Sequence, residues 1–235
     1  MNAFVDFLGP DGWQAVGLSL RVSIWATVLS LPLALYVAYV LARKEFWGKQ
    51  LLNGIVHLPL ILPPVVTGYL LLMTFGRRAP IGAWLEQTFG IVLAFRWTGA
   101  ALAAAIMAFP LMVRAMRLAI EAVDPKLEQA ARTLGASSAQ VFLSVTFPLI
   151  LPGMIAGAVL GFAKAMGEFG ATITFVSNIP GQTQTVPSAI YGFLQIPGGE
   201  SDALKLVGLS VVLSLGAVLI AEVLARRVAN RISGQ

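Results

Sequence analysis

Val22–Ala42, with the sequence VSIWATVLSLPLALYVAYVLA, carries no charged residue along its whole length. An α-helix needs about 20 mostly apolar residues to cross the roughly 30 Å hydrocarbon core of a bilayer. Arg21 and Arg43 bound this stretch, so its uncharged length matches one membrane crossing. The stretch therefore predicts a transmembrane helix.

Four further runs with few or no charges follow along the chain. They lie at Leu51–Phe75, Trp97–Val113, Pro148–Ala163 and Leu206–Ala221, and the Pro148 run can extend to about Val176 by crossing Lys164 and Glu168. Strands of a membrane β-barrel would alternate apolar and polar residues, and these runs do not. We therefore predict an all-α integral membrane protein with about five transmembrane helices.

The composition supports this fold class and excludes several others. Of 235 residues, 57% are hydrophobic and 11% are charged, with a mean hydropathy of +0.82. Soluble domains carry about 25% charged residues, so an ordinary soluble enzyme or a disordered tail is excluded. The chain has no cysteine, which removes disulfides and thiolate metal sites. We expect a single transmembrane domain over residues 1–235, with its core at about 13–226.

The basic residues predict the orientation. Basic residues collect in the cytoplasmic loops of membrane proteins, and five spans place the termini on opposite sides. With the N-terminus outside and the C-terminus inside, ten of the sixteen basic residues fall in inner segments: Arg43, Lys44, Lys49, Arg114, Arg117, Lys126, Arg132, Arg226, Arg227 and Arg231. The net charge of +5 then reflects helix ends near anionic lipid, and we expect no nucleic-acid partner.

The longest inner connection contains an expected helical hairpin at about residues 124–147. Asp124 followed by Pro125 is typical of a helix start, and Gly135 is typical of a helix end. A second short helix is expected over Ala139–Val145, before Pro148 and Pro152 open the next span. The hairpin is either a surface element packed on the spans or a docking site for a partner.

This hairpin resembles the Glu-Ala-Ala coupling motif of the membrane subunits of ATP-binding-cassette (ABC) importers. Ala130, Ala131, Gly135 and Pro148 fall in register with it, while Gln129 stands at the glutamate position and Glu128 precedes it. The resemblance implies the transmembrane fold of a type I ABC importer, in which the hairpin docks on a separate ATPase subunit. The sequence itself contains no phosphate-binding loop and no credible catalytic set.

The second expected span is interrupted by prolines. Pro59, Pro63 and Pro64 remove helix donors within one apolar run, so the helix is expected to kink or break there. Broken helices at membrane depth often line a transport pathway, although a static kink is the alternative. We expect Pro63, Pro64 and Thr67 along the pathway, and the solitary His57 near the inner surface without a ligand role.

The fourth expected span combines a stripe of small residues with two charges. Gly153, Gly157 and Gly161 recur every fourth residue and predict close packing against another helix. Lys164 and Glu168 are four residues apart and can pair, either as part of the pathway or as a self-neutralising structural pair.

The outer stretch 177–200 is uncharged until Glu200 but too rich in polar residues to cross the membrane. Val186–Leu194 is expected to form a short helix there, and its surroundings offer neutral hydrogen-bond donors suited to an oxygen-rich anion. The alternative is a solvated loop. We expect the pathway to continue along Glu168, Thr172, Thr174 and Ser177.

The residues around this stretch are similar to those of the molybdate permeases of ABC importers. The matching positions are Gly167–Thr172, Pro180, Gly181, Thr183–Thr185, Pro187 and Pro197–Glu200. The resemblance implies a permease that moves molybdate, and tungstate with it, by alternating access across the bacterial cytoplasmic (inner) membrane. It also implies a homodimer of permeases, two ATPase subunits and a periplasmic or extracellular molybdate-binding protein, with no cofactor, resident metal or catalytic residue in this chain.

Two other functions are weighed against this one. A sulfate/thiosulfate-type permease is a closely related possibility that would normally pair with a second, non-identical permease. A stand-alone secondary transporter would be expected to show an internal repeat and a proton or sodium site, but the sequence shows no convincing repeat between its halves, and five spans cannot divide evenly.

Overall fold

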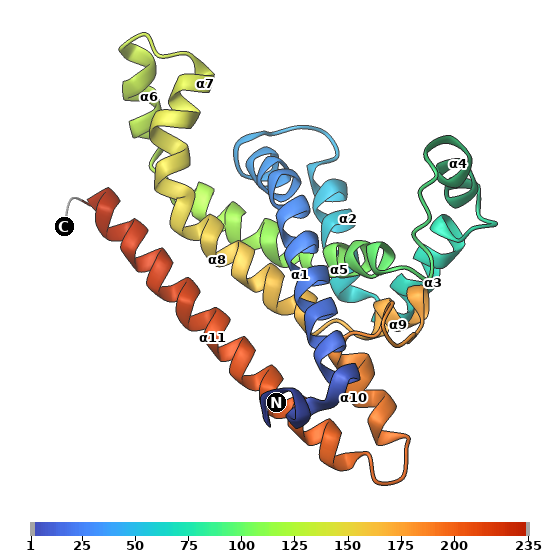
Figure 1. Ribbon diagram of the computed structural model, residues 1–235. Coiled ribbons are helices and arrows are strands. Elements are labelled where there is room, and N and C mark those ends of the chain that lie inside the picture. Colours follow the sequence, from blue (N-terminus) through green and yellow to red (C-terminus); the bar gives the residue numbers. More distant parts are fainter. Residues whose placement is uncertain (1–2, 234–235) are drawn as a thin grey trace.

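The computed structural model describes the backbone of residues 3–233, and the side chains of residues 7–220 together with Val223 and Arg227. All the regular structure in this described part is helical (Figure 1). In chain order the helices are α1 (Ala3–Arg43), α2 (Lys49–Ile61), α3 (Pro64–Phe75), α4 (Pro80–Phe89), α5 (Trp97–Glu121), α6 (Pro125–Thr133), α7 (Ser138–Val141), the π-helix η1 (Phe142–Thr146), α8 (Phe147–Met166), α9 (Gly170–Val176), α10 (Val186–Leu194) and α11 (Glu200–Ser233).

The predicted all-helical membrane fold is confirmed. Four helical stretches of the described chain are long and apolar enough to cross a membrane: Phe7–Arg43, Trp97–Glu121, Ser138–Met166 and Glu200–Ile220. The fifth expected span corresponds to the pair α2 and α3, which is bent by 111° at the Pro63–Pro64 break, so the described chain has four crossing helices, or five if this bent pair is one span. The proline-rich run therefore breaks the helix, as predicted.

Two expected boundaries were wrong. The third span continues beyond Val113 to Glu121, because Arg114, Arg117 and Glu121 extend the same helix at its polar end. The fourth span ends at Met166 rather than near Val176, because the backbone leaves the helix between Gly167 and Phe169 before α9 begins.

The start of the fourth span also differs from the prediction. The helix expected over Ala139–Val145 is not separate, because α7 passes through the five-residue π-helix η1 directly into α8. Pro148 and Pro152 lie inside this continuous 29-residue stretch. A proline cannot donate to the carbonyl four residues earlier, and the wider π turn before Pro148 accommodates the missing hydrogen bond. The hairpin is thus joined rigidly to a transmembrane helix.

Helix α5 lies at the centre of the bundle, with α1 and α8 packed along it. Its faces toward these helices carry mainly alanine and methionine, and Ala103, Ala104, Met112 and Met116 are fully or almost fully buried. Small side chains let neighbouring helices approach closely, which is the main source of helix association in a membrane.

The glycine stripe of α8 faces α5. A Cβ at Gly153 would overlap the Cβ of Ala119, and one at Gly161 would lie 2.6 Å from Cγ of Met112. At Gly157 the nearest atom would be the carbonyl oxygen of Met112 at 3.3 Å. The neighbour of this small-residue stripe is therefore a helix of the same chain.

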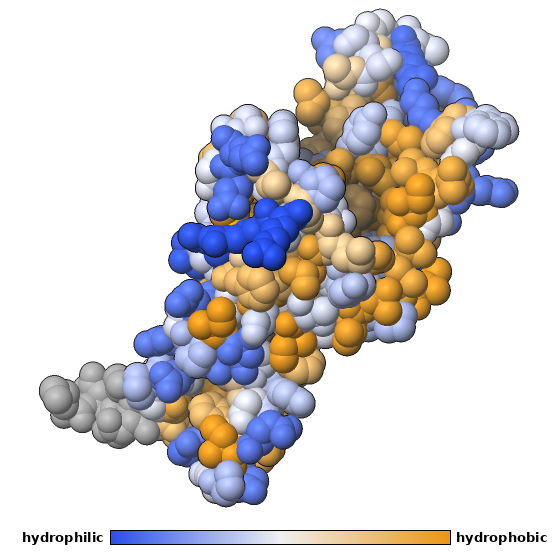
Figure 2. All heavy atoms as spheres, turned by 90° about the vertical axis from the view of Figure 1, so that its right-hand side faces the viewer, coloured by the Kyte–Doolittle hydropathy of each residue, from blue (hydrophilic) through white to orange (hydrophobic). Residues whose placement is uncertain are grey.

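The hairpin and the N-terminal end of α1 lie at opposite ends of the molecule, and α11 runs beside α8 toward the hairpin end (Figure 1). A broad apolar surface covers the middle of the face viewed in Figure 2, whereas hydrophilic residues gather toward its ends and in one compact patch. The side chains of Arg226 and Arg231, expected on the inner side, lie outside the described residues.

Candidate translocation and coupling sites

The two helix breaks meet in space. The first, at Pro63, leads into α3, and the second, at residues 167–169, leads into α9. A Cβ placed on Gly170 would lie 2.8 Å from Cβ of Pro64, and one on Gly68 would lie 2.5 Å from the carbonyl oxygen of Ala171. Only glycine at these two positions lets the α3 and α9 backbones come this close. The chain thus builds a crossing of two interrupted helices, a feature found at the substrate sites of membrane transporters.

An ion pair with a buried carboxylate lies at the second break. Nζ of Lys164 donates to Oε2 of Glu168 at 2.7 Å, and the Glu168 side chain is only 1% exposed. Oε1 of Glu168 accepts the backbone N–H of Ala171 at 3.0 Å. Glu168 lies beyond the end of α8, so the pair bridges the break instead of lying along one helix. Each carboxylate oxygen of Glu168 therefore has a hydrogen-bond donor, and Lys164 supplies its counter-charge.

The threonines near the crossing differ in the freedom of their hydroxyl groups. Thr172 donates to the carbonyl of Phe169 at 2.9 Å, and Thr174 donates to the carbonyl of Gly170 at 2.8 Å. Thr67 is 6% exposed, and its hydroxyl has no partner among the described residues. Of the three threonines expected along the pathway, Thr67 alone offers an unused hydrogen-bonding group in the described structure. Ser177 lies just past α9, exposed, with a φ of +66°.

The polar residues of the outer stretch largely organise that stretch itself. Thr183 accepts the N–H of Ile179 at 3.0 Å and donates to the carbonyl of Ser177 at 3.3 Å. Ser188 donates to the carbonyl of Thr185 at 2.9 Å, and all three of Thr183, Thr185 and Ser188 are buried. The set of free neutral donors expected here was wrong for these residues, because folding the loop consumes their hydroxyls. The expected short helix is α10, and Ser19 of α1 accepts its first N–H, that of Val186, at 2.7 Å.

The inner hairpin, defined here as residues 124–141, is built by its capping residues. The side chain of Asp124 accepts the N–H of Lys126 at 2.9 Å, and Pro125 begins α6. Gly135 turns the chain with a φ of +87°, a conformation that glycine adopts without strain. Ser137 and Gln140 then form a reciprocal capping box at the start of α7.

The hairpin presents apolar side chains at its surface. Leu134 is 88% exposed and Leu127 is also exposed, as is Leu143 in η1 just after the hairpin. A cavity of about 600 Å³ lies beside the turn and is lined by Leu134, Gly135, Ala136, Gln140, Leu143 and Ser144. Gln129 and Ala130 are exposed on α6, Ala131 is half-buried, and Pro148 lies in the first turn of α8, outside this cavity. Leu127 and Leu134 lie outside the stretches that could cross the membrane, and exposed leucines there are typical of a surface covered by a partner.

A polar network fastens the hairpin to the membrane helices. Nη2 of Arg43, the last residue of α1, donates to Oε1 of Glu128 and to the carbonyl of Val123, each at 3.1 Å. The hydroxyl of Thr146 in η1 donates to the same Glu128 oxygen at 2.8 Å. We call Arg43, Glu128 and Thr146 the hairpin clamp. The sequence did not identify Arg43 and Thr146 as partners of Glu128. Arg43 is 85 residues away from Glu128, and no spacing rule relates residues so far apart.

Among the described residues, no group of three His, Asp or Glu side chains could hold a metal ion. His57 bonds through Nδ1 to the carbonyl of Asn53 at 2.8 Å, within its own helix. The two places of interest are therefore the crossing of α3 with α9 and the inner hairpin.

The chain matches known membrane transport proteins along most of its length. Residues 30–232 match the model of a family described as "Binding-protein-dependent transport system inner membrane component". The chain is 60% identical over 214 residues to the "Molybdenum transport system permease protein ModB" of Escherichia coli (strain K12), covering 91% of this chain and 93% of that protein. It is 55% identical to the protein of the same name from Haemophilus influenzae, covering 93% and 96%. A "Sulfate transport system permease protein CysW" of Synechococcus elongatus is 36% identical, covering 90% and 75%.

Solved structures share the fold. A chain of a bacterial alginate ABC transporter in complex with a periplasmic protein has a TM-score of 0.75 at 18% identity, covering 97% of this chain and 83% of that one. A chain of the MetNI methionine ABC transporter, in an inward-facing conformation, has a TM-score of 0.71 at 15% identity, covering 97% and 99%. The family expected from the coupling motif is thus confirmed. The chain belongs to the binding-protein-dependent transport system inner membrane components, the membrane subunits of ABC importers.

Proposed function

We propose that this chain is the permease subunit of an ABC importer that moves molybdate, and tungstate with it, by alternating access. The observation that carries the proposal is the 60% identity to a molybdenum permease over 91% of the chain. Tungstate is included because it has the same charge as molybdate and nearly the same size.

The sulfate-type alternative is less well supported. The sulfate permease relative is 36% identical, well below the two molybdenum permeases at 60% and 55%. The sequence signature around Glu168 and Pro197–Glu200 also resembles the molybdate group more closely. A stand-alone secondary transporter is not favoured, since the chain belongs to a binding-protein-dependent family.

The proposed pathway passes the crossing of α3 and α9, along Pro63, Pro64, Thr67, Glu168, Thr172, Thr174 and Ser177. Because Lys164 neutralises Glu168, the crossing holds no net charge that would trap a dianion. The free hydroxyl of Thr67 offers a neutral contact for an oxyanion passing the bend. Weak, neutral contacts allow the oxyanion to be released rapidly. We assign the high-affinity selection of the substrate to the binding protein on the outer side.

The proposed coupling runs from the inner hairpin to the crossing along one continuous element. An ATPase subunit covers the exposed Leu134 and Leu143 and the cavity between them, so that Glu128, Gln129, Ala130, Ala131 and Gly135 move with it. The stretch from Ser138 to Met166 then carries the motion to the break before Glu168, and from there to α9 and α3. The hairpin clamp keeps α1 moving with the hairpin, so the chain acts as a single permease domain.

The assembly proposed is a homodimer of this chain with two ATPase subunits and a molybdate-binding protein on the outer side. The N-terminus lies outside and the C-terminus inside, in the bacterial inner membrane, with the inner hairpin in the cytoplasm. ATP hydrolysis belongs to the ATPase subunits, and this chain has no catalytic or cofactor-binding role.

The test is an assay of ATP hydrolysis by the complete complex in liposomes with its binding protein. We expect molybdate-loaded and tungstate-loaded binding protein to stimulate hydrolysis, and sulfate-loaded protein to leave it unchanged. Stimulation by sulfate alone would overturn the proposed substrate. Native mass spectrometry of the same complex should show two copies of this chain, and a second, different permease chain would overturn the homodimer.

A further inference from the structure

Three arginines surround one cavity beside the middle of α1, where Leu18 and Arg21 line it. The cavity has a volume of about 740 Å³, and Arg21, Arg77 and Arg96 line it together with residues of the outer stretch such as Gly181 and Gln182. All three arginines are exposed, and in the described part of the chain none of them forms an ion pair. None of the described residues that line this space is acidic, and we call it the arginine cavity.

The position of Arg21 places this cavity at a membrane surface. Arg21 and Arg43 are 22 residues apart on α1, which corresponds to about 33 Å of helix. The hydrocarbon core is roughly 30 Å thick, so a helix with Arg43 at one surface has Arg21 at the other. The guanidinium of Arg21 lies 3.8 Å from the ring centroid of Trp97, and tryptophan is enriched at this depth.

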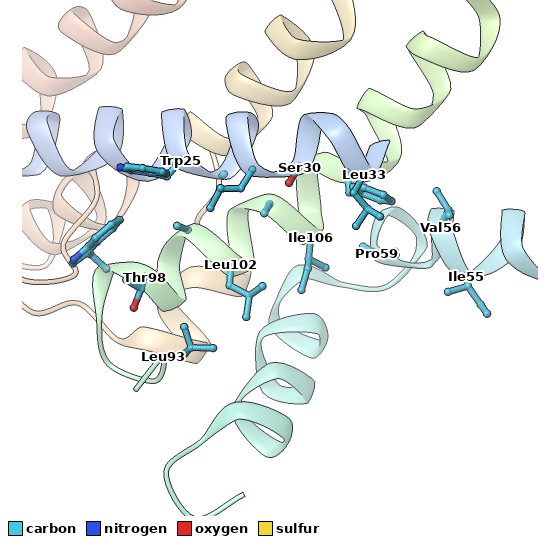
Figure 3. Close-up of a pocket in the computed structure, with 16 residues that line it drawn as sticks. Trp25, Ser30, Leu33, Ile55, Val56, Pro59, Leu93, Thr98, Leu102 and Ile106 are labelled. Carbon is cyan, nitrogen blue, oxygen red and sulfur yellow. The ribbon is translucent and has the colours of Figure 1, made fainter. Parts of the chain in front are cut away.

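A second, apolar space lies next to the arginine cavity, beside Trp97. It has a volume of about 670 Å³, and Trp97 lines both spaces. Its walls come from α1, α2, α5 and the segment before α5, with Trp25, Leu33, Val56, Leu102 and Ile106 among them (Figure 3). We call it the apolar groove.

The length of the apolar groove matches one leaflet of a bilayer. Its lining on α5 extends from Trp97 to Phe109, which corresponds to about 18 Å along the helix. One leaflet contributes about 15 Å of hydrocarbon. A hydrocarbon chain entering beside Trp97 would therefore follow the groove to about the middle of the membrane.

We infer that the arginine cavity and the apolar groove together form a binding site for an anionic phospholipid, with its phosphate among Arg21, Arg77 and Arg96 and an acyl chain in the groove. The adjacency of the two spaces at Trp97 favours an amphiphile over a free oxyanion, which would leave the apolar groove unfilled. Arginine is also the side chain best suited to phosphate, because its planar donors match two phosphate oxygens at once.

The test compares lipid retention by variants of the full-length chain in nanodiscs of phosphatidylcholine containing phosphatidylglycerol. Native mass spectrometry counts the lipids that stay bound. The wild-type chain should retain phosphatidylglycerol in preference to phosphatidylcholine. The R21Q/R77Q/R96Q variant should bind it about a hundredfold more weakly, since each basic side chain at the surface contributes about fivefold.

Two further variants separate the head-group and acyl-chain parts of the site. R78Q is the matched control, because Arg78 is an exposed neighbour of Arg77 that does not line the cavity, and it should retain lipid as the wild type does. A105F fills the apolar groove with a ring and should lose the lipid with all arginines in place. The single variant R77Q should show the fivefold loss even if the triple variant folds poorly.

The outcomes that overturn the inference are distinct. Equal lipid retention by R78Q and the triple variant would remove the head-group site, and full retention by A105F would remove the acyl-chain site. Displacement of the lipid by millimolar molybdate, without any preference for phosphatidylglycerol, would identify a free-oxyanion site. Loss of the dimer in A105F would show that a second copy fills the groove.

Discussion

Arg43 at the end of α1 and Glu128 in the first turn of α6 form an ion pair, with Nη2 and Oε1 3.1 Å apart and both side chains largely buried. Thr146 bonds to the same carboxylate oxygen, so one glutamate joins α1, α6 and the π-helical start of the α8 stretch. Glu128 directly precedes the glutamine at the glutamate position of the coupling motif. Its role in this structure is to hold the hairpin against the membrane helices.

Replacement of the clamp residues should uncouple ATP hydrolysis from transport. In E128Q and R43M the hairpin still presents its leucines, but its hold on α1 and η1 weakens. We expect uptake per ATP hydrolysed to fall severalfold while the complex still assembles, as measured by paired uptake and ATPase assays in liposomes. E121Q is the matched control, because in the described structure Glu121 pairs with Arg117 of its own helix, α5. Wild-type coupling in E128Q would contradict a mechanical role for the clamp.

Gly135 should tolerate only residues that adopt a left-handed backbone. Nothing would touch a Cβ at this position, so the effect of a substitution there comes from its φ of +87° and not from packing. Asparagine adopts the left-handed conformation readily. A β-branched side chain adopts it only at a cost of roughly 1–2 kcal/mol. We expect G135N to keep most ATP-driven uptake and G135V to lose it, with equal amounts of both in the membrane. Equal uptake by the two variants would show that the turn geometry is unimportant.

Alanine substitutions along the glycine stripe of α8 should destabilise the protein by different amounts. In G153A the new methyl group overlaps Ala119, which has no rotamer to escape into, so we expect a loss of about 1–3 kcal/mol in detergent. G157A should cost less, because its closest atom lies at 3.3 Å. G208A is the control, since a Cβ there meets nothing within 4 Å. The second substitution A119G should restore the stability of G153A, and failure of this rescue would place the clash elsewhere.

Replacement of Lys164 and replacement of Glu168 should lower the stability of the protein by different amounts. K164M leaves a carboxylate that is 1% exposed without a counter-charge, whereas E168Q leaves a lysine that is 29% exposed and reaches water. Thermal unfolding should therefore show a larger loss for K164M, about 3 kcal/mol, than for E168Q. The double variant K164M/E168Q should be more stable than K164M alone. If E168Q proved the more damaging change, the burial argument would be wrong.

The hydroxyl of Thr67 should matter to transport and not to folding. It is buried without a partner among the described residues, so T67V removes an unsatisfied polar group at nearly constant volume and should leave stability equal or raise it by about 1 kcal/mol. If the hydroxyl contacts the passing oxyanion, ATP-driven molybdate uptake should fall. T174V is the comparison, because the Thr174 hydroxyl already bonds to its own helix. Unchanged uptake in T67V would remove Thr67 from the pathway.

The sequence predicted the spans and the hairpin well because both depend on local rules. Uncharged runs of about 20 residues mark membrane helices, and Asp124, Pro125, Gly135 and Ser137 are capping and turn residues that act on their immediate neighbours. The continuous path from α7 into α8 was not predicted, because Pro148 usually marks a helix start and the π turn that tolerates it leaves no clear sequence signal.

The parts of the site that depend on distant contacts could not be read from the sequence. The meeting of Pro64 with Gly170, and of Arg43 with Glu128, joins residues far apart in the chain. The polar residues of the outer stretch show the opposite error, because composition alone does not reveal that Thr183 and Ser188 bond to nearby backbone. Hydroxyl groups can serve a ligand or the local backbone, and the folded structure decides between the two.

The central claim is that this chain conducts molybdate under the control of a partner ATPase acting through the inner hairpin. The most direct measurement is ATP-dependent uptake of radiolabelled molybdate into liposomes holding the permease, its ATPase and the molybdate-binding protein, for the wild type and G135V. We predict ATP-dependent molybdate uptake by the wild type, no sulfate uptake, and loss of uptake with G135V although the ATPase stays bound. Molybdate uptake without ATP or without the ATPase, or uptake of sulfate in its place, would contradict the account.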